Sequence, residues 1–358
     1  MKAYLILEDG SVYEGKHIGA RKEVVSEIVF NTSMTGYLEV MTDPSYIGQA
    51  VVMTYPLIGN YGICREDMES DRPWIDALIV RELSRTASNF RSQGTVEEFL
   101  LQYDIPGICG IDTRDLTKRL REHGTMNGML TTELNQGMEK IQEKIRSYQV
   151  KGVVQAVTAK EVYRLEGEGK RVALLDYGVK KSIARQLNLR GCEVTVYPAD
   201  TPAKVIIDSR PDGIMLSNGP GNPKENTDII REVRVLYESD IPIFAICLGH
   251  QLMALAAGGD TYKLKYGHRG GNHPVKDLET GRTYISSQNH GYAVDPESLD
   301  PGIARQAFVN VNDGTNEGLS YRGKKIFTVQ HHPEACPGPQ DSAYLFDRFI
   351  QMMEEHHA

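Results

Sequence analysis

The 358-residue sequence lacks the features that mark secreted and membrane proteins. Its five cysteines form no CxxC pair, and an odd cysteine count in a long chain does not favour a disulfide framework. The apolar start of the chain turns acidic at Glu8 and Asp9, too early for a signal peptide or a membrane span. We therefore expect a cytoplasmic protein with reduced thiols and no membrane partner.

Positive charge is also scarce. The chain has 40 Lys and Arg against 48 Asp and Glu, a net charge of -8, so it has no large positive field to attract a phosphate backbone. We expect no nucleic-acid partner. Low-complexity tracts and internal repeats are absent, and 40% hydrophobic with 25% charged residues is the balance of an ordinary globular protein. Disorder, collagen and coiled coil are excluded.

The length predicts two substantial domains at about 150 residues each. Residues 1–150 contain short strand patterns and turn signals, including an Asp-Gly turn, and predict a mixed β/α domain. Residues 151–170 predict a linker. Residues 171–358 alternate strands and helices, which predicts an open, mostly parallel α/β sheet. The expected strands there are 171–176, 192–197, 213–216, 241–246 and 325–330, and the helices are 180–189, 227–238 and 342–353.

One segment predicts a nucleophile elbow. The apolar strand 241–246 leads directly into Cys247 and then into a strong helix-forming sequence. A cysteine on such a turn points away from the sheet, and the helix N-terminus behind it favours the thiolate. Small residues are needed in this crowded turn, and Ala245 and Gly249 supply them. A buried core cysteine at a strand end is the alternative interpretation.

A second segment supplies an imidazole and a carboxylate. His331, His332 and Glu334 follow the expected strand 325–330, at the sheet edge where ligands of open α/β sheets bind. Cysteine, histidine and carboxylate are the three parts of a thiol triad. The two histidines and Cys336 could instead ligate a metal, but there is no HExxH motif, and we predict no metal site.

Two further segments are polar. The residues SNGPG, 217–221, follow a strand and could present backbone N–H groups to an oxyanion, although an ordinary turn has the same composition. Their spacing fits neither GxGxxG nor GxxxxGK[ST], so no nucleotide site is indicated. The residues SSQNHGY, 286–292, could bind an amide or amino-acid head group or form a surface turn.

Together these segments resemble the class I, triad-type glutamine amidotransferases. The resemblance spans about residues 171 to 355 and rests on CLGHQ, SNGPG, QNHGY and HPEACPGP. The whole chain is similar to the small, glutamine-hydrolysing subunits of carbamoyl phosphate synthetases. That narrower resemblance rests on FNTSMTGY, TDPSY and TYPLIGN in the first domain, at residues 30–37, 42–46 and 54–60.

The resemblance implies a role for particular residues. Cys247 would be the nucleophile, His332 the acid and base, and Glu334 the carboxylate that orients it. His332 is chosen over His331 because it directly precedes Pro333 and Glu334. The residues implied in glutamine binding are Ser45, Gly219, Gly221, Leu248, Gln251, Asn289, Gly291 and Tyr292.

The sequence departs from the family pattern at two positions. Ala245 stands where the usual elbow, G-x-C-x-G, has its first glycine, which is tolerable unless that position needs a positive φ. Cys336 stands where serine is common, and it adds a thiol without removing a catalytic group.

The resemblance also implies partners. Glutamine would be hydrolysed through a cysteinyl thioester, and the ammonia would pass through a channel to a large subunit. That subunit would bind ATP and Mg and make carbamoyl phosphate, while this chain would hold no cofactor. A higher oligomer of heterodimers is possible. The alternatives are another amidotransferase component, a cysteine peptidase or γ-glutamyl hydrolase acting alone, and a catalytically inactive regulatory subunit.

Overall fold

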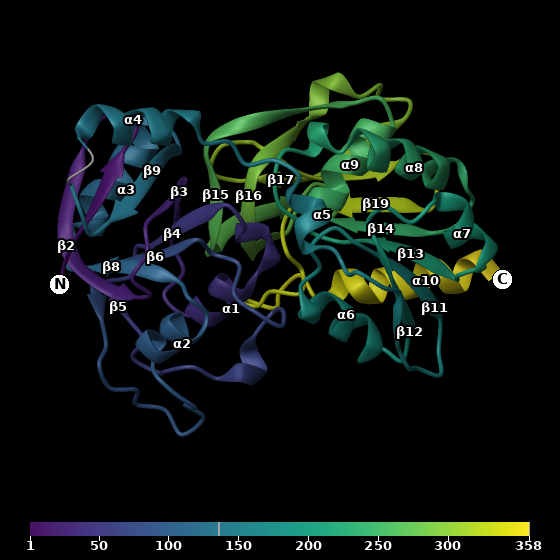
Figure 1. Ribbon diagram of the computed structural model, residues 1–358. Coiled ribbons are helices and arrows are strands. Elements are labelled where there is room, and N and C mark those ends of the chain that lie inside the picture. Colours follow the sequence, from purple (N-terminus) through teal and green to yellow (C-terminus); the bar gives the residue numbers. More distant parts are fainter. Residues whose placement is uncertain (135–136, 358) are drawn as a thin grey trace. The chain divides into compact units, whose positions relative to one another are not determined.

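The computed structural model describes residues 1–134 and 137–357 (Figure 1). The chain divides into two compact units, Met1–Lys151 and Gly152–Ala358. The expected linker, residues 151–170, carries helix α5 (Val153–Val157) and strand β10 (Tyr163–Leu165), and Val154 packs into the core of the second unit. This segment is therefore structurally part of the second unit. No helix in the described ranges is long and apolar enough to cross a membrane.

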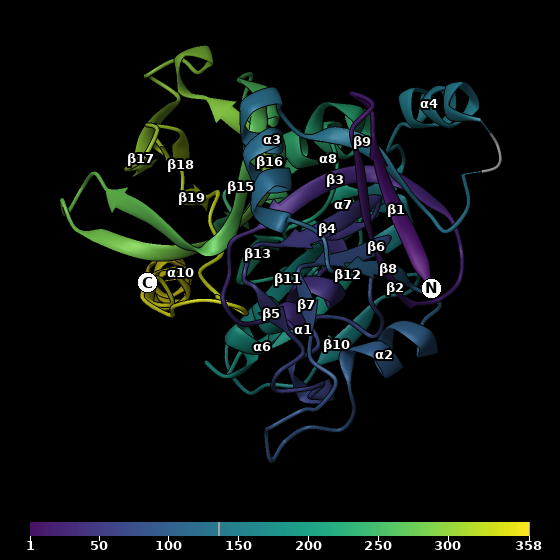
Figure 2. The same ribbon diagram turned by 90° about the vertical axis from the view of Figure 1, so that its left-hand side faces the viewer.

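The first unit is built around a closed barrel. The Asp9–Gly10 turn joins β1 and β2 as an antiparallel hairpin, and Gly10 has φ 91°, which glycine adopts without strain. Strands β1 and β9 lie side by side (Figure 2). In barrel order the strands are β1 (Lys2–Leu7), β2 (Val12–Gly19), β8 (Pro106–Cys109), β6 (Ala77–Val80), β4 (Gln49–Met53), β3 (Val24–Asn31) and β9 (Met126–Thr131).

Helices and short elements connect these strands. Helix α2 begins with a capping box formed by Thr95 and Glu98, and α3 has Asp112 as its N-cap and ends before Gly124. The connecting elements are α1 (Tyr37–Thr42), η1 (Pro44–Tyr46), β5 (Leu57–Ile58), η2 (Arg65–Asp67), β7 (Glu82–Leu83), α2 (Val96–Gln102), α3 (Thr113–His123) and α4 (Met138–Ser147).

The second unit contains a ten-stranded sheet in the order β10-β12-β11-β13-β14-β19-β18-β17-β15-β16. The neighbouring strands β12, β11, β13, β14 and β19 run parallel, as the alternation of strands and helices in the sequence predicts. These are β12 (Glu193–Pro198), β11 (Arg171–Asp176), β13 (Gly213–Leu216), β14 (Ile243–Ile246) and β19 (Ile326–Val329).

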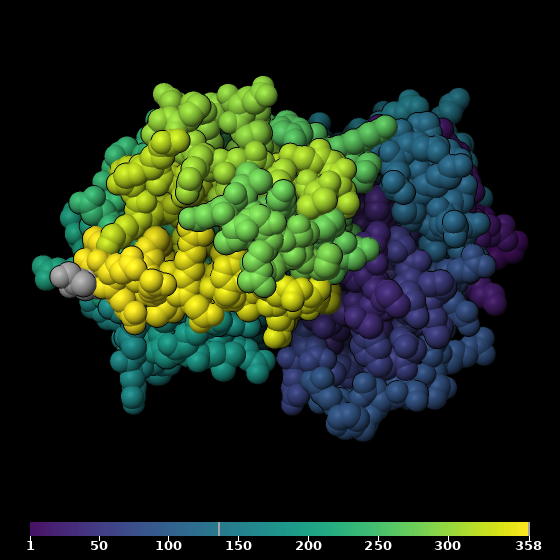
Figure 3. Space-filling view, turned by 180° about the vertical axis from the view of Figure 1, so that it is seen from behind, coloured from purple at the N-terminus to yellow at the C-terminus, as the bar shows by residue number. Residues whose placement is uncertain are grey.

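Helices cover both faces of this parallel part. Side chains of α7 (Ala203–Asp208), α8 (Thr227–Glu238) and α9 (Leu248–Ala256) pack on one face, and those of α6 (Lys181–Asn188) and α10 (Tyr344–His357) on the other. Phe244 on β14 stacks on Phe327 of β19 with ring centroids 4.4 Å apart, and Phe346 of α10 meets Phe244 edge-on. Helix α10 also forms part of the surface, yellow in Figure 3.

The rest of the sheet is antiparallel, so the sheet as a whole is mixed. It consists of β18 (Asn316–Tyr321), β17 (Ala304–Asn310), β15 (Asp260–Asp277) and β16 (Thr283–Asp295). Sequence patterns predicted no strand in these ranges. The β15 and β16 pairing has irregular register between Lys263 and His268 and again between Gly270 and His273, which interrupts the two-residue alternation that marks a strand.

Candidate active site

Cys247 occupies the turn between β14 and α9. Its backbone has φ 52° and ψ -105°, a sparsely populated conformation for a residue with a side chain, and its N–H donates to the Val329 carbonyl oxygen at 2.8 Å. The neighbouring Gly249 passes so close to β13 that a Cβ atom there would lie 2.5 Å from the Leu216 carbonyl oxygen. The crowding therefore requires a small residue after the cysteine.

Ala245, the departure from the usual elbow, lies on β14 and pairs with Leu216 on one side and Thr328 on the other. It is fully buried, and it is absent from the non-glycine residues with positive φ among the described ranges. The position therefore does not need a positive φ, and the elbow forms without a glycine there.

His332 and Glu334 lie in the loop that follows β19, the strand adjacent to β14. The His332 N–H donates to the Ser287 carbonyl oxygen at 2.9 Å, which ties the loop to β16. His332 Nδ1 and Glu334 Oε1 are 2.6 Å apart, so Nδ1–H donates to the carboxylate. Both side chains are buried. The carboxylate therefore fixes the ring and leaves Nε2 for another partner.

Among the described residues this Nε2 atom has no hydrogen-bond partner, but the nearby Cys247 thiol acts on the pKa of the ring. Burial lowers the pKa of His332, but attraction to the Glu334 carboxylate, together with the interactions with Cys247 and Glu334, outweighs burial and raises the pKa to about 10. Burial alone would raise the pKa of Glu334, but nearby Lys180 and His332 lower it to about 2. A protonated ring between a carboxylate and a thiol can hold and return a proton.

Lys180 completes this group of charges, and the sequence patterns did not single it out. It is 2% exposed, and its Nζ donates to Glu334 Oε1 and to the Ala335 carbonyl oxygen, each at 2.9 Å. Its backbone N–H donates to Asn218 Oδ1 at 3.1 Å. The sequence signal that could have identified Lys180 is its position four residues after Asp176, the last residue of β11. The carboxyl ends of parallel strands meet at one sheet edge, so a residue soon after β11 can reach the site.

His331 has quite different surroundings. Its ring packs edge-on against Phe308, with centroids 5.5 Å apart, and its Nδ1 has no hydrogen-bond partner among the described residues. Burial lowers its pKa to about 4, so the ring is neutral at neutral pH. Two adjacent histidines thus differ in charge because only His332 faces a carboxylate at hydrogen-bond distance.

The predicted glutamine-binding residues of α9 and β16 lie next to the elbow. The Cys247 thiol donates to the Asn289 carbonyl oxygen at 3.6 Å. Gln251 Nε2 donates to the Tyr292 carbonyl oxygen at 2.8 Å and to Gln330 Oε1 at 2.9 Å. Gly291 lies between Asn289 and Tyr292 on β16. The structure thus brings the CLGHQ and QNHGY segments together.

The SNGPG loop reaches the same place from β13. A Cβ atom at Gly219 would lie 2.7 Å from Leu248 Cδ2 and 2.3 Å from the Tyr177 carbonyl oxygen, so only glycine allows this approach. Gly221 has φ 86°. The Ser217 hydroxyl accepts from the Tyr177 N–H at 2.9 Å, so the loop also anchors the segment that leads to Lys180.

Ser45 belongs to the first unit, on η1. It is buried, and its N–H donates to Asp43 Oδ1 at 2.9 Å. Its part in glutamine binding remains a prediction.

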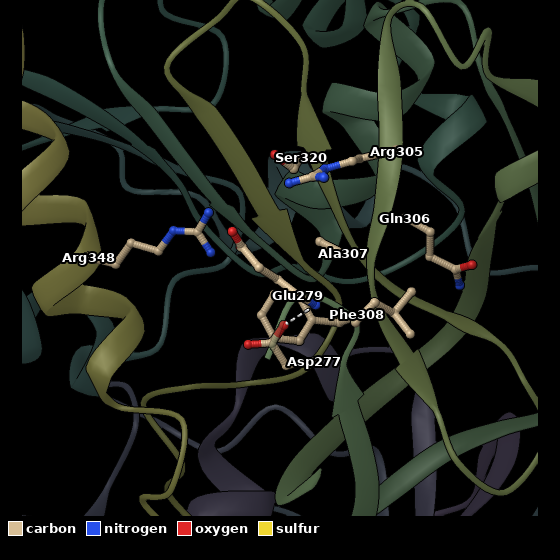
Figure 4. A pocket seen from close by; sticks show the side chains of 9 residues that line it. Asp277, Glu279, Arg305, Gln306, Ala307, Phe308, Ser320 and Arg348 are labelled. Carbon is tan, nitrogen blue, oxygen red and sulfur yellow. Dashed lines mark hydrogen bonds between the residues drawn. The ribbon is translucent and has the colours of Figure 1, made fainter. Parts of the chain in front are cut away.

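A cavity of about 170 Å³ in the second unit lies apart from these residues (Figure 4). Its charged side chains are two acids and two bases, Asp277, Glu279, Arg305 and Arg348. None of the predicted site residues lines it. Because the opposite charges balance, the cavity has no net charge with which to select an ionic ligand.

Comparison with known proteins finds family matches in both units. Residues 5–130 match the family described as "Carbamoyl-phosphate synthase small chain, CPSase domain", and residues 173–352 match "Glutamine amidotransferase class-I". The chain is 49% identical over 356 residues to the carbamoyl phosphate synthase small chain of Symbiobacterium thermophilum, covering 97% of this chain and 98% of that one. The chain belongs to the carbamoyl phosphate synthase small chain family.

A second relative agrees with this assignment. The carbamoyl phosphate synthase small chain of Clostridium perfringens is 50% identical over 353 residues, which cover 98% of this chain and 99% of that one. A solved glutamine amidotransferase from Thermotoga maritima has a TM-score of 0.38 at 16% identity and covers 53% of this chain and 95% of its own. The first-unit match separates the chain from amidotransferase components and lone hydrolases that lack such a domain.

Proposed function

We propose that Cys247, His332 and Glu334 form the catalytic triad with which this small chain hydrolyses the side-chain amide of glutamine. As a member of its family, the chain is a glutamine-hydrolysing small chain that supplies ammonia to carbamoyl phosphate synthase. The observations that support the residue assignment are the buried hydrogen bond between His332 and Glu334, after the strand β19 that pairs with β14, and the strained elbow that holds Cys247 at the end of β14.

The first chemical step forms a thioester. Transfer of the Cys247 proton to His332 gives a thiolate beside the protonated ring, and the thiolate attacks the amide carbonyl of glutamine. Negative charge then develops on the carbonyl oxygen, where the N–H groups of Leu248 and Gly219 would donate hydrogen bonds. The loss of one such donor costs roughly 100- to 1000-fold in rate. Leu248 is the first residue of α9, so the helix N-terminus also favours this charge.

The second step releases both products. His332 returns its proton to the departing nitrogen as the C–N bond breaks, and ammonia leaves. A water molecule then attacks the thioester while His332 takes its proton. The C–S bond breaks, glutamate is released, and the proton returns to the sulfur. Glu334 keeps Nδ1–H engaged throughout, so the same Nε2 atom carries the proton in both directions.

The remaining predicted residues would hold the substrate. Gln251 and the β16 segment of Asn289, Gly291 and Tyr292 present amide and backbone groups beside the nucleophile. Polar groups of this kind recognise the α-amino and carboxylate ends of an amino acid. Gly219, Gly221, Leu248 and, from the first unit, Ser45 complete the proposed glutamine-binding set.

A small chain implies a large-chain partner. Ammonia free in neutral solution would mostly protonate to ammonium and lose its nucleophilicity, so it must reach a second active site unprotonated. We propose that it passes through an internal channel to the large chain, where ATP and Mg would be bound. The glutaminase activity would then be low without that partner, and heterodimers could associate further.

The test compares two nitrogen sources in the assembled complex. Cys247→Ser should abolish glutamine-dependent carbamoyl phosphate synthesis but leave synthesis from added ammonium salts unchanged. The control, Cys336→Ser, should retain both activities. If Cys247→Ser retained the glutamine-dependent rate, the proposed nucleophile would be wrong. Loss of both activities with Cys247→Ser would indicate that this substitution damages the complex, and the nucleophile would then be identified by trapping with a glutamine-like electrophile and peptide mapping.

A further inference from the structure

A second group of buried histidines lies in the antiparallel part of the sheet. His268 and His273 come from β15, and His290 comes from β16. Their rings are in contact, since the centroid of His268 lies 4.9 Å from that of His290 and 5.2 Å from that of His273. Glu317 of β18 is fully buried beside them, with Oε1 3.6 Å from His268 Nδ1.

The outer nitrogen of two of these rings is already engaged. His268 Nε2 and Asp313 Oδ2 are 2.8 Å apart, so Nε2–H donates to the carboxylate. His290 Nδ1–H donates to the Tyr292 carbonyl oxygen at 2.8 Å. When the rings are neutral, as metal binding requires, these bonds fix both tautomers, because a neutral imidazole carries only one N–H. They leave a lone pair on His268 Nδ1 and another on His290 Nε2. Without a metal, burial lowers the pKa of His268, but the Asp313 and Glu317 carboxylates outweigh it and raise the pKa to about 9.

Neither of these two nitrogens has a hydrogen-bond partner among the described residues. Ligand atoms of His268, His290 and Glu317 lie within 4.8 Å of one another. Buried polar atoms without partners are uncommon and need an explanation. An imidazole whose second nitrogen donates to a carboxylate or a carbonyl is the usual arrangement of a metal-bound histidine.

We propose that His268 Nδ1, His290 Nε2 and Glu317 Oε1 bind a divalent transition-metal ion of the Zn²⁺ class. Two imidazoles and a carboxylate suit zinc, whose bonds to such atoms are about 2.0–2.2 Å long, so the three side chains need only a small inward shift. The positive ion also offsets the fully buried Glu317 carboxylate. This inference does not rest on glutamine hydrolysis.

The carboxylate has further support that would orient it toward the ion. Glu317 Oε2 accepts from Gln288 Nε2 at 2.8 Å, and Oε1 accepts from Asn310 Nδ2 at 3.1 Å. Gln288 immediately precedes Asn289, whose carbonyl oxygen accepts from the Cys247 thiol. A metal here would therefore fix the β16 segment beside the nucleophile and act as a structural element of the second unit.

The experiment measures metal content in the full chain. The protein is treated with EDTA, incubated with ZnSO₄, separated from free metal by gel filtration, and analysed by mass spectrometry of the elements. The parent chain should retain about one zinc ion. Glu317→Gln and His268→Gln should bind zinc at least 10-fold more weakly while keeping the circular dichroism spectrum of the parent.

Matched controls separate this site from other histidines and thiols. His250→Gln changes a histidine that is equally buried but lies outside the cluster, and His123→Gln changes an exposed one; both should retain zinc. Co²⁺ in place of Zn²⁺ should show no sulfur-to-metal charge-transfer band, because the proposed ligands contain no thiol. Such a band, or zinc retained equally by Glu317→Gln, would place the metal elsewhere and contradict the proposal.

Stability gives a second readout. Zinc at about 100 times its dissociation constant should raise the melting temperature of the parent by roughly 5–10 °C and leave that of Glu317→Gln unchanged. A parent chain that neither retains zinc nor is stabilised by it would overturn the proposal. The cluster would then be an ion pair in which His268 carries a proton in place of the metal.

Discussion

In the described part of the second unit, two buried histidines, His332 and His268, each donate a hydrogen bond to a carboxylate, which is buried for His332 and exposed for His268. His332 donates through Nδ1 to Glu334, at 2.6 Å, and His268 donates through Nε2 to Asp313, at 2.8 Å. In each pair the carboxylate fixes one nitrogen of the ring. The pairs differ in what the second nitrogen faces. The second nitrogen of His332 has no hydrogen-bond partner among the described residues, and the nearby Cys247 thiol acts on the pKa of this ring. The second nitrogen of His268 lies near the Glu317 carboxylate and the His290 ring.

This difference shows that the chemistry of a histidine beside a carboxylate depends on the group that lies near its other ring nitrogen. A thiol at a helix N-terminus can lose a proton to the ring and become a nucleophile, so the first pair suits acid and base catalysis. A second imidazole and a buried carboxylate have no group to activate but can share a cation. The place of each pair in the sheet determines which group lies near the second nitrogen. The first pair follows parallel strands, and the second lies among antiparallel strands.

The strongest test of this comparison replaces the two adjacent histidines. His332→Asn should lower glutamine-dependent synthesis about 1000-fold or more, because the ring both takes and returns the proton. His331→Asn should lower it less than about 10-fold, because that ring has no carboxylate partner. Steady-state assays of the complex with glutamine, and with ammonium salts as control, measure both. The reverse ranking would show that His331 is the base.

A smaller loss of activity is expected when Lys180 is replaced. This buried cation contacts Glu334 of the catalytic pair. Lys180→Met keeps most of the side-chain volume but removes the charge that lies 2.9 Å from Glu334. Glutamine-dependent kcat should fall about 10- to 100-fold, as for a small misplacement of a catalytic group.

A purely structural role for Lys180 would lower the amount of folded enzyme and leave its pH profile unchanged. Because Lys180 lowers the pKa of His332, the limb of the pH profile that reports this ring should move to higher pH in Lys180→Met. Lys180→Arg should restore part of the rate and of the profile. An unshifted profile in Lys180→Met would contradict the positioning role.

The smallest expected effect is a change with pH in the free energy of unfolding. The pKa of His332 is raised from 6.5 to about 10, so the pair stabilises the fold fully below about pH 6.5 and loses this contribution as pH rises toward 10. The pKa of Glu334 is lowered to about 2, so its contribution is present above about pH 4.5 and is lost as pH falls toward 2. The stability difference between the parent and His332→Asn should therefore shrink from pH 6.5 to 9.5, by an amount on the order of 1–3 kcal/mol.

Urea unfolding followed by far-ultraviolet circular dichroism measures this difference. Tryptophan fluorescence would not serve, because the single tryptophan, Trp74, lies in the first unit. The exposed control His123→Gln should differ from the parent by the same amount at both pH values. A parent-minus-His332→Asn difference that is constant or grows toward high pH would show that His332 is not protonated in the folded chain.

Much of the fold could be predicted because local patterns determine local structure. The Asp-Gly hairpin, the cap at Asp112 and the alternation of strands with helices in the second unit all depend on residues close together in the sequence. The segment 151–170 and the strands β15 to β18 were missed. Their signals are weak because irregular register interrupts the alternation and long-range pairing, such as β10 with β12, supplies the stabilisation.

By itself the sequence determined which chemistry was available. A cysteine between an apolar strand and a helix, and a histidine and a glutamate after another strand, are local facts that need no fold. Only the tertiary structure decided which groups meet. It buried Lys180 against Glu334 and gathered His268, His290 and Glu317 from three strands. The physical reason is that charge, burial and tautomer depend on neighbours across space, and a residue's neighbours along the chain do not reveal them.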